Sequence, residues 1–234
     1  MSLYPTHPMN PRFPSPSRLG LSRKLLLVGL ALAGLATGEA LAQMGNLRNT
    51  FPGRRIGGGT RGECTARLIA HLVPSSSVFA PGASRTVGIV EGPSANPRPL
   101  GLTFIPLRGN GTAEAARKVA QSRTIPAAAA GVTLLTVPAF EGPTVWETAY
   151  RCEDAPAPVS PGTDLDFVTT DAPPALSLLV SEAGAEDAAL QRALKQLRSS
   201  CGATADRATV AQAFGLTDVL TSEWPAQLPV RCPG

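Results

Sequence analysis

The sequence predicts a mainly β protein, an antiparallel sandwich-like domain followed by a small α-helical C-terminal subdomain. From residue 64 onward, short apolar runs rich in β-branched residues alternate with Pro, Gly, Asn and Ser, as in proteins built of short strands and turns. After Val180 the apolar residues instead repeat with a helical period. Four cysteines lie in the same part of the chain, and their even number favours a domain closed by disulfides.

Residues 1–42 are typical of a cleavable signal peptide. The first 24 residues contain four basic residues and no acidic one, and the uncharged apolar run Leu25–Ala36 follows. The tripeptide Ala40-Leu41-Ala42 then has the small residues that signal peptidase accepts. A helix over this apolar run would be about 18 Å long, too short for a hydrocarbon core of about 30 Å. We therefore expect a periplasmic or secreted product, cleaved near Ala42-Gln43, that is not an integral membrane protein.

The charge balance argues against nucleic acid as a partner. Four of the 21 basic residues and one of the 17 acidic residues precede Gln43, which leaves 17 basic and 16 acidic side chains. Nucleic-acid-binding proteins usually present a concentrated basic surface instead. The remaining charge is uneven, because residues 43–123 carry 11 basic and 3 acidic residues. Such asymmetry is typical of solvated faces of one domain or of a basic segment that contacts an anionic surface.

The β-rich domain is expected over residues 64–152. Its predicted strands are Leu68–Val73, Arg85–Val90, Leu102–Leu107, Val132–Val137 and Thr144–Tyr150. The last run alternates, so that Trp146 and Tyr150 share one face. The segment Thr112–Gln121 has a short helical pattern. Before the domain, residues 43–63 are rich in Gly and Arg and nearly free of apolar pattern, which predicts a flexible arm.

A Pro-rich stretch over residues 153–165 is a predicted linker or long loop. In residues 166–234 we expect strands at Asp166–Thr169 and Leu176–Val180, and then the helical subdomain. Its first helix carries Leu190, Leu194 and Leu197 on one face. A second helix is predicted at Asp206–Phe214, followed by Gly215, and a third at Thr217–Ser222.

The cysteines Cys64, Cys152, Cys201 and Cys232 predict two structural disulfides, because an even number in an exported chain favours pairing. Three pairings are possible. We favour Cys64–Cys152 and Cys201–Cys232, since each pair then closes one compositional segment. No two cysteines have zinc-ligand spacing, and a C-x-x-C redox motif is absent from the sequence.

The segment Gly53–Gly62 (GRRIGGGTRG), followed by Cys64, resembles the opening motif of the domain of unknown function 928 family of mostly cyanobacterial exported proteins. The segment Thr144–Cys152 (TVWETAYRC) resembles the strand that leads to a second cysteine in that family. The resemblance implies an exported β-rich domain with a Cys64–Cys152 bridge and a helical C-terminal part. The Pro-rich insert and the Cys201/Cys232 pair depart from the family's pattern, and the resemblance implies no activity.

The sequence motifs assign no catalytic residue, no cofactor and no metal. The Gly-rich segment Gly57–Arg61 lacks the lysine of a phosphate-binding loop. His71 lacks a G-x-S-x-G nucleophile motif, and we interpret it as a strand histidine with a satisfied hydrogen bond. The aspartates of the segment before the predicted strand Leu176–Val180 lack the spacing of a calcium loop, which favours turn chemistry: Asp164, Asp166 and Asp171.

Arg54, Arg55 and Arg61 are the candidate binding residues, because guanidinium groups hold phosphate or carboxylate through paired hydrogen bonds. The leading hypothesis is a non-enzymatic binding or structural module of the cell envelope. Its partner would be an anionic envelope component or another envelope protein. The alternative is an extracytoplasmic hydrolase whose site assembles only in the fold. His71 beside a serine and a carboxylate in a cleft would favour this alternative, and a His71 buried in the sheet would contradict it.

Overall fold

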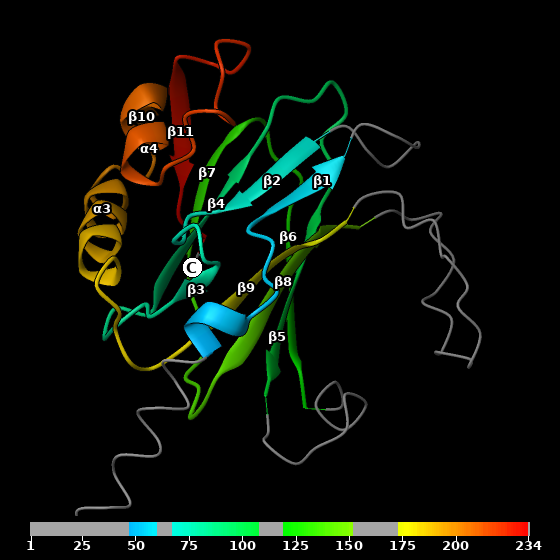
Figure 1. The fold of residues 1–234 in the computed structure, drawn as a ribbon. Helices are drawn as coiled ribbons and strands as arrows, with labels where there is room; N and C mark the ends of the chain where they lie inside the picture. Colours follow the sequence, from blue (N-terminus) through cyan, green and yellow to red (C-terminus); the bar gives the residue numbers. More distant parts are fainter. Residues whose placement is uncertain (1–46, 60–66, 108–118, 152–172, 234) are drawn as a thin grey trace, which may run out of the picture. The chain divides into compact units, whose positions relative to one another are not determined.

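The computed structural model describes residues 47–59, 67–107, 119–151 and 173–233 (Figure 1). These residues belong to one unit, Met44–Gly234, and the unit before it is not described. Several predicted features lie outside the described residues: the signal peptide, Arg61, Cys64, Cys152, the Pro-rich linker and the strand Asp166–Thr169. In the described part, no helix is long and apolar enough to cross a membrane.

Two sheets form the sandwich-like fold that the sequence predicts (Figure 1). The six-stranded sheet has the order β1 (Ile56–Gly59), β2 (Arg67–His71), β4 (Thr86–Glu91), β7 (Gly131–Thr136), β11 (Gln227–Arg231) and β10 (Thr204–Asp206). The five-stranded sheet has the order β3 (Val78–Phe79), β9 (Ala175–Leu179), β8 (Thr144–Tyr150), β5 (Leu100–Pro106) and β6 (Gln121–Ile125). The pairs β7–β11 and β3–β9 are parallel, so the sheets are mixed rather than purely antiparallel. Parallel strands must be joined by a long connection, and the connection from β7 to β11 contains helices α3 (Asp187–Ser199) and α4 (Arg207–Ala213).

Helices α3 (Asp187–Ser199) and α4 (Arg207–Ala213) form the predicted helical part late in the chain and lie on one side of the six-stranded sheet (Figure 1). Leu194 of α3 packs close to Gly88 of β4, where an added Cβ would lie 3.0 Å from Leu194 Cδ2. The glycine therefore lets the helix approach the sheet. Asp206 caps α4 by accepting a hydrogen bond from Thr209 N at 2.7 Å. Residues 217–222 form turns instead of a third helix.

Six predicted strands agree with β2, β4, β5, β7, β8 and β9 to within two residues at each end. The predicted helix at Thr112–Gln121 is wrong at its described end, because Gln121 begins β6. Strands from the C-terminal part enter both sheets, since β9 lies between β3 and β8, and β11 lies beside β7. Each sheet therefore contains strands from both sides of the predicted boundary between the β-rich domain and the C-terminal subdomain.

Residues 47–59, predicted as part of a flexible arm, are built into the fold, and the prediction is wrong for them. Arg54 exchanges two backbone hydrogen bonds with Leu176, at 3.0 and 2.7 Å, and β1 pairs with β2. An added Cβ at Gly57 would lie 2.3 Å from the backbone nitrogen of Ala175. Glycine is therefore required for this close approach. The glycines that suggest flexibility in the sequence instead allow β1 to connect the two sheets along one side of the sandwich.

Arg48 fastens the same segment to the start of α3. Its Nη2 donates to Asp187 Oδ2 at 2.7 Å, and the Asp187 side chain is fully buried. The same oxygen accepts a hydrogen bond from Gly184 N at 2.7 Å. A buried carboxylate without a cation carries a large desolvation penalty, so Arg48 contributes to the stability of the whole unit.

Cys201 and Cys232 form the predicted disulfide, with their Cα atoms 5.7 Å apart. The bridge joins the chain just after α3 to the residue that follows β11. A disulfide indicates an oxidising compartment, in agreement with part of the predicted localisation.

We expect Arg48→Met to lower the free energy of unfolding by about 3 kcal/mol, because Asp187 would stay buried without its cation. Urea unfolding followed by tryptophan fluorescence would measure the change. The matched control is Arg54→Met, since among the described residues the exposed Arg54 guanidinium donates only to the carbonyl oxygen of Pro174. Equal, small effects of the two substitutions would show that the segment is not anchored through Arg48.

Candidate functional site

One row of side chains defines the interior face of the six-stranded sheet. Four residues lie directly opposite one another across β2, β4, β7 and β11: His71, Ile89, Thr133 and Arg231. His71 contacts Ser177 of the other sheet, so the row points between the sheets. Because side chains alternate along a strand, Gln227 and Pro229 of β11 also belong to this face.

The interior face of β11 lacks a covering strand among the described residues. Gln227 and Pro229 are exposed and Arg231 is partly exposed, whereas Leu228 and Val230 on the opposite face are buried. The sheet that contains β11 has six strands and the facing sheet has five, with β6 as its last strand on this side. Beside β6 and opposite β11 there is therefore a position that a further strand could occupy.

The backbone of β6 is oriented to accept such a strand. Arg151 N donates a hydrogen bond to Pro99 O, and Leu107 N donates one to Pro143 O, both at 2.8 Å. In the register of β5 and β8, the odd-numbered residues of β5 are therefore the ones whose backbone groups form hydrogen bonds with β8. Alternation then directs the even-numbered residues of β5 toward β6, whose residues opposite them are odd-numbered. The N–H and C=O groups of Ser122 and Thr124 consequently point away from β5. No described strand pairs with this edge.

Two hollows lie between β6 and the six-stranded sheet and a third lies beyond the end of β6, and we call the three together the β6 groove. The first and second, of about 420 and 430 Å³, share Phe104, Gln121 and Pro138 in their linings. The third, of about 590 Å³, lies beyond Ile125 and is lined by Thr133 and Arg231. Their order along β6 is the reverse of their order along β7, as expected for a groove bounded by two antiparallel strands.

The β6 groove carries an excess of positive charge in its described lining. Arg85 and Arg123 line the second hollow and Arg231 lines the third, whereas Glu141 in the first is the acidic counterpart. Apolar side chains provide much of the remaining wall, including Phe104 and Leu135. A ligand with acidic and apolar groups would match this surface.

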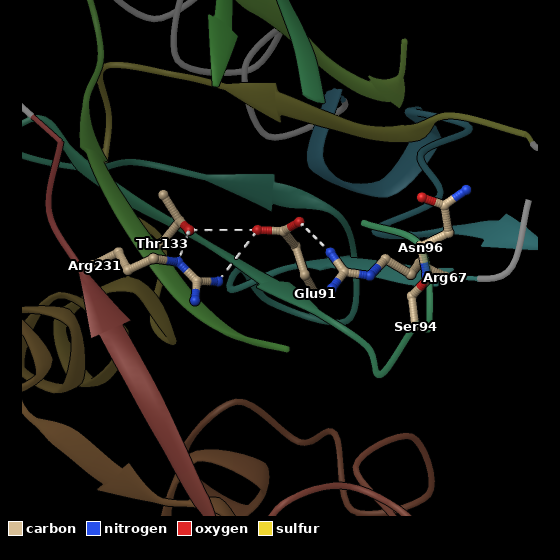
Figure 2. A network of polar contacts seen from close by, with 6 residues as sticks. All are labelled: Arg67, Glu91, Ser94, Asn96, Thr133 and Arg231. Atoms are coloured by element: carbon tan, nitrogen blue, oxygen red, sulfur yellow. Dashed lines mark hydrogen bonds and ion pairs between the residues drawn. The ribbon is translucent and has the colours of Figure 1, made fainter. Parts of the chain in front are cut away.

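A buried polar network lies at the Arg231 end of the groove, with Glu91 between two arginines (Figure 2). Arg67 Nη1 donates to Glu91 Oε1 at 2.9 Å, and both side chains are at most 2% exposed. Arg231 Nη2 approaches Glu91 Oε2 at 3.4 Å, and Arg231 Nε approaches Thr133 Oγ1 at the same distance. Hydrogen bonds of this length are weak, so Arg67 is the principal partner of Glu91.

Desolvation dominates the electrostatics of this network. Burial raises the pKa of Glu91 above its ordinary value, while Arg67 and Arg231 lower it in part. Burial and the nearby Glu91 carboxylate also raise the pKa of the Tyr150 hydroxyl, so Tyr150 stays neutral. The nearby Arg67 guanidinium lowers the pKa of Tyr150 in part. The network thus contains two guanidinium groups against one carboxylate.

His71 lies in the middle of the sandwich interior and is fully buried. Its Nδ1 pairs with Ser177 Oγ and its Nε2 with Thr148 Oγ1, both at 2.8 Å. The imidazole stacks on Trp146 with ring centroids 3.6 Å apart and planes 5° apart. Burial lowers the pKa of His71 to about 3, so the ring is neutral at physiological pH. The interpretation as a strand histidine with satisfied hydrogen bonds is confirmed.

This geometry contradicts a hydrolase built on His71. Ser177 is beside the ring, but both ring nitrogens already bond hydroxyl groups and the cluster is closed to solvent. A substrate cannot reach it. In the described part of the chain, groups of His, Cys, Asp and Glu that could hold a metal ion are absent. The predicted turn aspartates Asp164, Asp166 and Asp171 lie outside the described residues.

The structure places two of the three predicted binding arginines. Arg54 bonds the carbonyl oxygen of Pro174 from an exposed position. Arg55 donates to the carbonyl oxygens of Val73 and Phe214 at 2.8 Å and of Gly215 at 2.7 Å. Arg55 therefore ties β1 to the end of α4, and an anion would have to replace these bonds. A role for Arg54, Arg55 and Arg61 at an anionic surface stays a prediction.

We expect His71 to make the protein less stable in acid. The pKa of His71 lies near 3 in the folded protein and near 6.5 in the unfolded chain. The unfolded chain therefore binds the additional proton below pH 6.5, and stability falls by about 1.4 kcal/mol per pH unit between these two values. Urea unfolding at pH 7, 6 and 5 would measure this slope. The variant His71→Gln should be less stable at pH 7 and should lack this part of the slope. Identical slopes would contradict a buried neutral histidine.

Comparisons with known proteins identify no relative of this chain. No family model, no curated protein and no solved structure matches the chain. The resemblance of Gly53–Cys64 and Thr144–Cys152 to the domain of unknown function 928 family accordingly stays a prediction.

Proposed function

We propose that the protein is an exported, non-enzymatic binding module of the cell envelope that takes up an extended peptide segment as an additional strand beside β6. The observation that carries the proposal is the strand position opposite β11, which none of the described strands occupies. Sheet edges with unpaired backbone groups accept extended peptides, with backbone hydrogen bonds giving affinity and side-chain pockets giving selectivity.

The alternation of a strand defines the side chains that the partner should present. Every second residue would point into the β6 groove, toward Phe104 and Leu135. Apolar side chains suit these positions because they remove apolar surface from water. Acidic groups elsewhere in the segment would pair with Arg85 and Arg231 at the rim. The partner is thus an acidic, extended segment of another envelope protein.

The cellular setting supports the same proposal. The leader has the features of an export signal, and the Cys201–Cys232 disulfide requires an oxidising compartment. An anionic envelope polymer that contacts the arginines of residues 54–61 is compatible with it. The hydrolase alternative loses its support because His71 is enclosed.

Ser122→Pro is expected to weaken peptide binding by at least about tenfold, because it removes an outward N–H group that the added strand requires. Proline is tolerated at an edge strand when its nitrogen faces away from the sheet, so the fold should persist. Ser122→Ala is the matched control, since it changes only the side chain and should bind as the original protein does.

The measurement begins with a display library of random decapeptides selected on the full protein. Selected peptides are synthesised with a fluorescent label, and their affinities for the three proteins are compared by anisotropy. Circular dichroism confirms that both variants keep the β signal. Enrichment of alternating apolar and acidic residues, with binding lost only in Ser122→Pro, would support strand addition. Equal binding to Ser122→Pro, or no enrichment, would exclude it.

A further inference from the structure

The third hollow of the β6 groove, here called the Arg231 hollow, differs from the other two in its chemistry. Its wall is largely apolar and is formed by the segment 125–128, by Val230 and by the Cys201–Cys232 disulfide. Thr133 and Arg231 are the polar side chains in its lining. A single cationic group in an apolar hollow is suited to a ligand that combines one anionic group with an apolar body.

The guanidinium of Arg231 is available for such a ligand. Its side chain is 27% exposed, and its contacts to Glu91 and Thr133 are long, at 3.4 Å. Glu91 is already held by Arg67 at 2.9 Å, so the network carries one positive charge in excess at Arg231. The Arg231 bonds to Glu91 and Thr133 use Nη2 and Nε, and Nη1 donates a hydrogen bond to none of the described residues. A carboxylate would therefore meet a charge that Glu91 compensates only in part, and a donor that bonds none of the described residues.

The backbone preserves the space around this guanidinium. An added Cβ at Gly131 would lie 3.0 Å from Arg231 Nη1 and 2.6 Å from Pro229 O. Only the absence of a side chain at the start of β7 lets Arg231 lie there. The disulfide holds the end of β11 from the other side, because Cys232 follows Arg231 directly. The backbone that carries Arg231 is thus held in place before any ligand arrives, which lowers the entropic cost of binding.

We propose that the Arg231 hollow binds the C-terminal carboxylate and the apolar last side chain of the peptide that pairs with β6. This inference rests on the proposed strand addition. Since β6 runs from Gln121 toward the hollow at Ile125, the peptide would lie parallel to β6, with its end against Arg231. The partner class is therefore narrowed to acidic extended segments that end in a free, apolar C-terminal residue.

The test uses a small probe that cannot form a strand. N-acetyl-L-leucine supplies the carboxylate and the apolar side chain, and N-acetyl-L-leucinamide is the same molecule without the charge. Both are titrated into the ¹⁵N-labelled protein, and the amide signals of Ala127, Ala128 and Gly202 at the hollow are followed by NMR. We expect the acid to bind about tenfold more tightly than the amide, as one charge-assisted hydrogen bond provides.

Three variants make the assignment specific. Arg231→Gln should abolish the preference for the acid, whereas Arg192→Gln on the exposed side of α3 should leave it unchanged. Ala127→Phe fills the hollow without touching the Glu91 network and should remove binding of both probes, which covers the case in which Arg231→Gln alters the fold. Equal affinity for acid and amide, or a preference retained by Arg231→Gln, would overturn the proposal.

The two proposals fail in different ways. The peptides selected on the full protein are also compared as free acids and as C-terminal amides. If Ser122→Pro abolishes peptide binding but acid and amide bind equally, strand addition stands and the chain-end site is wrong. If the leucine acid binds through Arg231 but Ser122→Pro changes nothing, the hollow takes carboxylates and the strand position is wrong.

Discussion

Closure of one side of the sandwich by β1 is the constraint on which the rest of the structure depends. The strand pairs with β2 of one sheet, and the chain around it bonds the start of β9 in the other. Glycine at position 57 permits this contact, because the backbone of Ala175 occupies the space where a side chain would begin. With that side closed, the unequal numbers of strands in the described part of the two sheets leave a position on the opposite side, between β6 and β11, that no described strand occupies.

The polar interior is the second consequence of this architecture. Interior positions of a closed sandwich would be apolar, yet Glu91 and Arg67 are buried here as an ion pair. Such a pair seldom stabilises more than an apolar replacement would. Its place beside the partly exposed Arg231 gives it another role, since it fixes a net positive charge at one end of the groove. His71, by contrast, is neutral and serves the packing of Trp146.

Local patterns explain which parts of the fold were predictable. Strands such as Thr144–Tyr150 alternate clearly and were found to the residue, and the helix at Asp187–Ser199 follows from its apolar spacing. The strand Ile56–Gly59 could not be found in this way, because its glycines have no side-chain pattern and indicate flexibility. The strand Gln121–Ile125 was missed for a related reason, since most of its side chains are exposed or partly exposed at the sheet edge. The role of Arg48 was equally hidden, because its partner Asp187 is distant in sequence.

By itself the sequence determined the β-rich class and the late helices, which depend on composition and on neighbouring residues, and it favoured export and the Cys201–Cys232 pair among three possible pairings. Only the tertiary structure decided which residues form the candidate site. Arg231 reaches the interior face because β11 pairs with β7 in one register, and a shift of one residue would turn it toward the helices. That register is set by contacts between distant segments, and no local pattern in the sequence records it.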